Sequence, residues 1–118
     1  THDQEDAFSI ADRIIVMNKG KIEQIDTARN IYLKPKTEFV LNFIGSANVD
    51  RGYFVRPEAI RVSENGEEAT IIDKTFKGAF IEYIIDYKGS KYKMLRLNNE
   101  EEFEIGSKIK IEMEMREL

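Results

Sequence analysis

Residues 79–87 read AFIEYIIDY, and this stretch decides the fold class. Every second side chain from Ile81 to Tyr87 is apolar, which is the spacing of a β-strand and not the 3.6-residue period of a helix. Phe80 and Ile84 add apolar area to the opposite face. The sequence therefore predicts a strand that is covered on both sides.

The same two-residue period continues outward from this strand. Residues 108–115, KIKIEMEM, alternate apolar and charged side chains without a fault, as a half-buried strand does. Further strands are expected in YFVR, ATIIDKTF and YKMLRL, with turns at Asn65-Gly66, Lys77-Gly78 and Lys88-Gly89. About five or six short strands in roughly 70 residues favour a small antiparallel barrel, because closure leaves no long unpaired edge.

The first 45 residues have a different character. Asp3 is placed to cap a helix that continues to Ile14, and residues 14–17 and 22–25 predict a β-hairpin across an Asn-Lys-Gly turn. Thr27 is expected to cap a second helix, ending at Tyr32, and Thr37 a third helix over EFVLNFI, ending at Gly45. The fold class is therefore α+β and mainly β, with a helical segment and a short hairpin before the barrel.

Composition excludes several classes of function. The chain has 118 residues, one histidine, no cysteine and a net charge of -4. A nucleic-acid surface needs clustered Lys and Arg, and neither half of the chain has them. Because the chain has no cysteine, it cannot form a thiolate zinc site. With a single histidine it also lacks the residues of a Cys-His triad, and nothing in the sequence supports a Ser-based triad. The longest apolar runs are far shorter than the roughly 20 residues of a membrane-spanning helix.

Two apparent motifs fail on inspection. Gly20-Lys21 lacks the upstream glycine and the following Ser or Thr of a phosphate-binding loop. The acidic run at residues 100–104 is interpreted as a solvated charge run, so no metal site is expected. The aromatic side chains of the strands are interpreted as core and interface residues, because no basic groove accompanies them.

Two stretches of the sequence carry a family resemblance. Residues 1–45, THDQEDAFSIADRIIVMNKGKIEQIDTARNIYLKPKTEFVLNFIG, resemble the C-terminal end of the nucleotide-binding domain of ABC importer ATPases. FVRPEAIRV, residues 54–62, resembles the V-R-P-E segment of the TOBE domain, the small OB-like barrel that follows this domain. The resemblance implies two domains, a remnant of the nucleotide-binding domain at residues 1–45 and a TOBE-type barrel at residues 46–118.

The resemblance also implies a role for the lone histidine. His2 corresponds to the switch-loop histidine, which in the family contacts the γ-phosphate of ATP. A hydrogen bond from imidazole stabilises the charge that develops as the phosphoryl group leaves. The phosphate loop, the signature motif and the acidic strand of the family lie upstream, so this chain is expected to be a fragment that neither binds nor hydrolyses ATP. ATP and Mg are cofactors of the parent protein only, and no cofactor or metal is expected here.

In the parent protein, the resemblance implies the ATP-hydrolysing subunit of an importer that energises solute uptake. The chain is expected to be its regulatory and dimerisation part, with a homodimer, transmembrane permease subunits and an external solute-binding protein as partners, and no nucleic acid. It is expected in the cytoplasm, peripheral on the inner face of the plasma membrane. The candidate interface residues are Phe80, Tyr83, Ile84, Met113 and Met115.

Two other functions stay open at this point. Related barrels hold molybdate between subunits, so the chain could be a free-standing oxyanion or metabolite binder, with Thr75, Lys77 and Gly78 as candidate ligands. A nucleic-acid-binding barrel is the third hypothesis. The sequence of the barrel does not identify the transported solute, which could be an oxyanion, ferric iron, a polyamine or a sugar.

Overall fold

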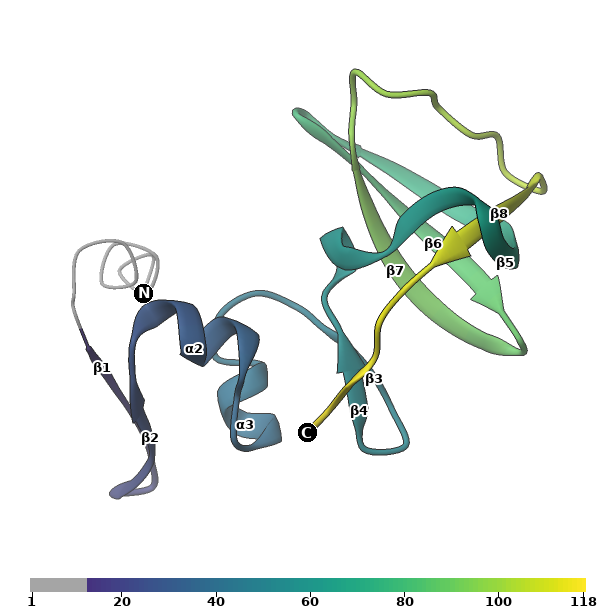
Figure 1. Cartoon of the computed structure of the whole chain (residues 1–118). Coiled ribbons are helices and arrows are strands. Elements are labelled where there is room, and N and C mark those ends of the chain that lie inside the picture. Colours follow the sequence, from purple (N-terminus) through teal and green to yellow (C-terminus); the bar gives the residue numbers. More distant parts are fainter. Residues whose placement is uncertain (1–12) are drawn as a thin grey trace. The chain divides into compact units, whose positions relative to one another are not determined.

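The computed structural model describes residues 13–118, and these form two compact units that are described separately below (Figure 1). The first unit extends to Ala47, and the second comprises Asn48–Glu117. The expected helix from Asp3 lies outside the described residues except at its end, where Ile14 begins a strand instead. The domain boundary after residue 45 stays a prediction.

The hairpin of the first unit is confirmed. Strands β1 (Ile14–Asn18) and β2 (Lys21–Asp26) pair antiparallel, with Asn18 opposite Lys21. The two turn residues, Lys19 and Gly20, have φ values of 52° and 79°. Positive φ at both positions is the geometry of the tight turn whose twist matches that of paired strands.

Two short helices follow, each capped as the sequence predicts. The Thr27 hydroxyl accepts a bond of 3.2 Å from the Asn30 amide at the start of α2 (Ala28–Leu33). The Thr37 hydroxyl does the same for Val40 at the start of α3 (Glu38–Leu41). These bonds satisfy amides that have no partner inside the helix.

The expected length of the third helix is wrong. It ends at Leu41 and does not continue to residue 44. Both the backbone N–H and the side-chain amide of Asn42 donate to the Glu38 carbonyl, at 3.1 Å each. Phe43 N–H then bonds Val40 O, three residues back, which tightens the chain into a turn.

The second unit is built from two antiparallel sheets. The smaller has the strand order β3-β4-β9, and the larger has the order β7-β6-β5-β8. The strands are β3 (Asn48–Asp50), β4 (Tyr53–Val55), β5 (Arg61–Lys77), β6 (Phe80–Tyr87), β7 (Ser90–Leu97), β8 (Lys108–Glu112) and β9 (Arg116–Glu117), with a 3₁₀ turn, η1 (Pro57–Ala59), before β5. The fold class is therefore confirmed, although the two sheets are open and do not close into a barrel.

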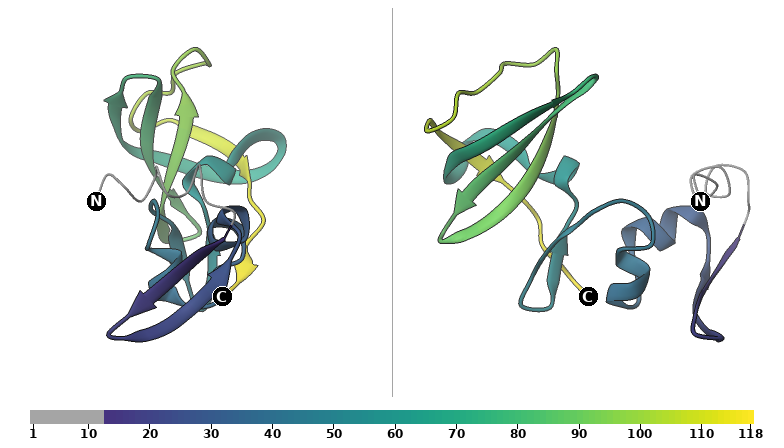
Figure 2. Two further views of the ribbon diagram at one scale, coloured as in Figure 1. Left: turned by 90° about the vertical axis from the view of Figure 1, so that its left-hand side faces the viewer. Right: turned by 180° about the vertical axis from the view of Figure 1, so that it is seen from behind.

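The core of the second unit lies on one face of the larger sheet. Ile81, Tyr83 and Ile85 of β6 are 6%, 0% and 0% exposed, as the two-residue period predicts. They pack with Ile71 of β5 and Met94 of β7. The turns expected at Lys77-Gly78 and Lys88-Gly89 are present, and the connection between β7 and β8 extends beyond the ends of the strands (Figure 2).

The turn expected at Asn65-Gly66 is absent. These residues lie inside β5, where the pairing shifts so that Val62 and Glu67 both face Ile111. A Cβ at Gly66 would come 2.3 Å from the carbonyl oxygen of Ile111. Glycine is required here because two backbones approach closely, and the extra residues form a bulge that bends the strand.

The alternating stretch at residues 108–115 is a strand only as far as Glu112, so the strand is shorter than expected. Ile109 and Ile111 of β8 are buried against β5, as expected. The strand then ends at Glu112, and Met113 and Met115 pack half-buried against the same core. The chain continues into β9, which pairs with β4, so this segment connects the larger sheet to the smaller one.

Candidate functional site

A groove of about 430 Å³ lies where η1 and the start of β5 meet the end of β7, and we call it the β7 groove. Phe80 and Leu97 face each other across the β6–β7 pair and are 41% and 47% exposed. Charges of both signs surround this apolar centre. The residues that line the β7 groove are Glu58, Ile60, Arg61, Val62, Phe80, Leu95, Arg96, Leu97 and Glu100.

Arg96 is fixed from two directions. Its guanidinium forms an ion pair of 3.1 Å with Glu100 and lies 4.8 Å from the centroid of the Phe103 ring. The planar guanidinium group of arginine is stabilised when it stacks on the face of an aromatic ring. On the β7 side the groove is therefore lined by an ion pair whose arginine is held by Glu100 and Phe103.

The five predicted interface residues lie in different environments. Phe80 is in the β7 groove, and Ile84 is half-buried on the same face of β6. Met113 and Met115 are half-buried against the core. Tyr83 is 0% exposed, and its hydroxyl accepts a 3.1 Å bond from the Phe103 amide, so it is a core residue with no surface to offer a partner.

The candidate oxyanion ligands lie on the β5–β6 hairpin. Thr75, Lys77 and Gly78 are all exposed. The ammonium of Lys77 is 3.4 Å from a carboxylate oxygen of Glu82, and the same oxygen is 3.8 Å from Lys93. Because both lysines share the carboxylate of Glu82, part of their positive charge is already compensated, which weakens this position as an oxyanion site.

A lysine of β5 holds the long connection between β7 and β8. Lys74 Nζ lies 2.6 Å from Glu102, 2.7 Å from Glu104 and 3.2 Å from the Phe103 carbonyl. The hydrogen bonds to Glu102 and Glu104 raise the pKa of Lys74, and the bond from Lys74 lowers the pKa of Glu104. Lys74 and the two glutamates Glu102 and Glu104 therefore form an ionic cluster, which we call the Lys74 strap. The sequence analysis did not predict this role for the acidic run.

A second network lies beside the bulge of β5, next to a polar pocket of about 400 Å³. Tyr87 donates a 2.8 Å bond to Glu67, and Lys88 lies 2.8 Å from the other oxygen of Glu67. The bonds from Lys88 and Tyr87 lower the pKa of Glu67, whereas burial raises the pKa of Tyr87. These groups neutralise one another, so the network stabilises the bulge and leaves no reactive group.

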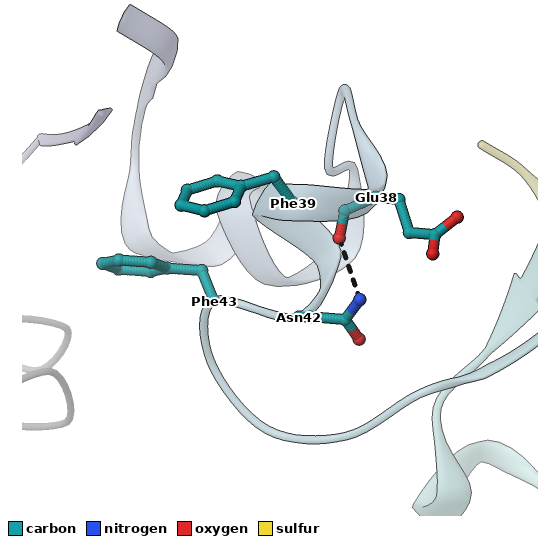
Figure 3. A pocket seen from close by; sticks show the side chains of 4 residues that line it. All are labelled: Glu38, Phe39, Asn42 and Phe43. Carbon is teal, nitrogen blue, oxygen red and sulfur yellow. Dashed lines mark hydrogen bonds between the residues drawn. The ribbon is translucent and has the colours of Figure 1, made fainter. Parts of the chain in front are cut away.

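The first unit has a pocket of about 590 Å³ on α3. Figure 3 shows Phe39 and Phe43 pointing to one side of the helix, with Glu38 and Asn42 on the other. Phe39 is 39% exposed, and Phe43 packs against the small core of Val16, Ile31 and Val40. Among the described residues that line the pocket, no convergent polar groups lie on its aromatic side, and a specific small-molecule site requires such groups.

The remaining predicted sites concern His2 and metal ions. His2 lies outside the described residues. Within residues 13–118, no group of three or more acidic, His or Cys side chains is placed to hold a metal ion. The helices of this part of the chain are all too short to span a membrane.

The family is decided by the second unit. Residues 53–118, which include all of the larger sheet, match the model of the TOBE domain. The chain belongs to the TOBE domain family. The V-R-P-E segment that carries the resemblance lies in this match, with Val55 and Ile60 in its core and Arg56 buried.

The curated relatives of this TOBE chain are ATP-binding subunits. The chain is 58% identical over 66 residues, 52% of its length, to the spermidine/putrescine import ATP-binding protein of Bacillus anthracis, and these residues are 20% of that protein. It is 51% identical over 65 residues, 55% of its length, to the sulfate/thiosulfate import ATP-binding protein of Nocardia farcinica, again 20% of that protein.

A longer match reaches an ABC transporter ATP-binding protein of Escherichia coli K12 that is uncharacterized. The two chains are 36% identical over 106 residues, which are 77% of this chain and 32% of that protein. The chain therefore spans about a fifth to a third of the length of these relatives. The resemblance to ABC importer ATP-binding subunits is confirmed.

Proposed function

We propose that this chain is the C-terminal regulatory and dimerisation part of the ATP-hydrolysing subunit of an ABC importer. The TOBE match over residues 53–118, together with relatives that are import ATP-binding proteins, is the observation that supports the proposal. On this proposal the intact subunit binds ATP and Mg, works with permease subunits and an external solute-binding protein, and lies on the cytoplasmic face of the membrane.

The proposed homodimer uses the β7 groove. A two-fold interface brings the same patch of each copy together, so the patch must complement itself. The groove has an apolar centre of Phe80 and Leu97, with Arg61 and Glu58 at its margin. Opposite charges around an apolar centre satisfy this condition, because an arginine of one copy can meet a glutamate of the other.

Sedimentation of the 118-residue chain over a range of concentrations tests the dimer. Phe80→Asp should shift the equilibrium to monomer, because it places a charge in the apolar centre. Phe76→Asp is the matched control, since Phe76 is 71% exposed and its cross-strand neighbour is Ile81, on the other face of the same hairpin. Equal effects of the two variants, or a wild-type chain that stays monomeric, contradict this interface.

We also propose that His2 acts only within the intact subunit, where it contacts the γ-phosphate. Incubation of this chain with MgATP should release no more phosphate than the buffer, and His2→Ala should change nothing. Phosphate release that His2→Ala abolishes would refute the proposal.

The oxyanion hypothesis has the weaker support, because Lys77 is paired with Glu82. Titration calorimetry with molybdate, tungstate and sulfate separates it from the dimerisation role. We expect no heat of binding from any of the three anions. Saturable heat that Lys77→Met removes would favour the oxyanion binder instead.

A further inference from the structure

Strand β3 lies along the edge of β7 without pairing to it. Each strand is at the end of its own sheet, β3 in the smaller sheet and β7 in the larger. Among the described residues no backbone pairing joins the two strands. Side chains connect them instead, and we call this junction the seam.

The main contact of the seam comes from Asn48. Its side-chain N–H donates 2.8 Å to the carbonyl of Lys93, and its side-chain oxygen accepts 2.7 Å from the Lys93 amide. An amide side chain offers the same donor and acceptor as a peptide group. Asn48 therefore takes the place of a neighbouring strand and protects the edge of β7 at this residue.

A second contact strengthens the seam two residues away. The hydroxyl of Tyr92 donates 3.2 Å to the carboxylate of Asp50. Tyr92 is 6% exposed and its ring stands edge-on to Tyr87, with centroids 5.9 Å apart, so its position is fixed. The contacts at Asn48 and Asp50 come from both ends of β3, and they hold the whole strand against β7.

The smaller sheet has little pairing of its own. Its three strands have three, three and two residues. β4 and β9 are joined by only two residue pairs. An isolated sheet of this size is marginal in water. Its order therefore depends on the seam and on Val55, the residue of β4 that enters the main core.

We propose that β3, β4 and β9 form a lid that opens as one unit at the seam, with Asn48 and Asp50 as its latch. Opening frees the peptide group of Lys93 at the edge of β7. The lid has few backbone bonds of its own, but opening also exposes Phe54 and Val55, which are 3% and 2% exposed in the closed form. The larger sheet keeps its pairing during this motion, because Tyr83, Ile85 and Met94 stay packed against one another after Val55 leaves the core.

Amide hydrogen exchange of the 118-residue chain, followed by NMR, tests the lid. In Asn48→Ala the protected amides of β3, β4 and β9 and the amide of Lys93 should exchange faster by a common factor, on the order of ten- to thirtyfold, because two hydrogen bonds are lost. Amides in the β5–β6 pairing should keep their rates. Acceleration at Lys93 alone, or in all strands equally, overturns the proposal.

Three further variants keep the result interpretable. Asn98→Ala removes a side-chain hydrogen bond outside the seam, from the side-chain amide of Asn98 to the Gly78 carbonyl. It should leave the exchange rates of the lid amides unchanged. Tyr92→Phe removes only the hydroxyl that reaches Asp50 and should accelerate the same set of amides by a smaller factor. Asn48→Ser keeps a short hydroxyl that can replace at most part of the two bonds, and should accelerate the same set of amides by a smaller factor if the alanine variant fails to fold.

Discussion

The two units of this chain bury their apolar side chains to different extents. In the second unit, the core face of β6 is closed, with Tyr83 and Ile85 at 0% exposure. In the first, Val16 is equally buried beneath the helices, but the other face of the hairpin is open in the described structure. That open face carries Ile15, Met17, Ile22 and Ile25, each 43% to 57% exposed.

The difference shows how each unit obtains its order. The second unit has a contiguous core that draws on β4, β5, β6, β7 and β8. The first has a cluster of three fully buried apolar residues, and it adds a buried polar side chain, Gln24. Gln24 receives a bond from the Lys36 amide at 2.9 Å and donates to the Lys34 carbonyl at 3.2 Å. Among the described residues of the first unit, the hydrogen bonds of Gln24 to the loop therefore add to the small apolar cluster.

The largest expected effect is at Tyr83. Tyr83→Ala should lower the free energy of unfolding of the second unit by about 3–5 kcal/mol, because a large buried side chain leaves a cavity. Urea unfolding followed by the amide signals of β6 measures this. Ile84→Ala, at the half-buried position on the other face, should cost much less, and equal losses would contradict the assignment of the core face.

A smaller effect is expected at Gln24 in the first unit. Gln24→Ala should cost about 1–2 kcal/mol, because the buried Gln24 side chain loses its bonds with the Lys36 N–H and the Lys34 carbonyl. The amide signals of β2 and α2 report the loss. Asn42→Ala is the control, since it removes an exposed bond to the Glu38 carbonyl. A Gln24→Ala chain as stable as the control would show that hydrogen bonds do not order this unit.

The two units should also differ in how acid and salt act on them. The pKa of Glu104 is below its usual 4.5 because of the bond from Lys74, so the strap stabilises the fold above pH 4.5 and is lost as the pH falls through the lower folded value. The pKa of Lys74 is raised, so its contribution is lost only when the pH rises above its usual 10.5 through the higher folded value.

In the first unit, the pKa of Asp26 is lowered mainly by hydrogen bonds from Asn30 and Thr27, which carry no charge. Salt screens the ionic strap more than these neutral bonds. NMR titration of both carboxylates at low and high salt should therefore move the pKa of Glu104 toward its usual value and leave that of Asp26 nearly fixed. If added salt shifts the pKa of Glu104 and the pKa of Asp26 equally, the two carboxylates do not differ in how they are stabilised.

The smallest effect is expected on the open face of the hairpin. Met17 and Ile22 are cross-strand neighbours, and replacing both with Thr should change the free energy of unfolding by no more than about 0.5 kcal/mol. Binding of a hydrophobic dye should fall. Val16→Thr, at a fully buried position of the same strand, should cost clearly more. A large loss in the double variant would show that this face is covered in the folded chain.

Much of the local structure could be predicted because its causes are local. The two-residue period of residues 79–87 identified the buried face of β6, and the glycine dipeptides identified the turns on either side of it. Thr27 and Thr37 marked both helix starts. The length of α3 was predicted wrongly although its cause is also local, since the Asn42 side chain bonds the Glu38 carbonyl four residues earlier.

The candidate site was predicted less completely. Phe80 and Tyr83 were both predicted to be interface residues, but Phe80 is 41% exposed and Tyr83 is 0% exposed, although alternation had already placed them on opposite faces of β6. Lys74 and Asn48 carried no local signal, since their partners are 28 and 45 residues away. The sequence features that accompany the Lys74 strap are a lysine in a strand, Lys74, and the run of glutamates at residues 100–104.

The amino-acid sequence by itself determined the strand periods, the hairpin turns, the helix caps and the family of this chain, since each depends on neighbours within a few residues. Tertiary structure alone decided that Asn65-Gly66 forms a bulge, that the strand expected at residues 108–115 ends at Glu112, and that Asn48 protects the edge of β7. These outcomes depend on which distant backbone lies alongside. At Gly66 that neighbour is the carbonyl of Ile111, which leaves no room for a side chain.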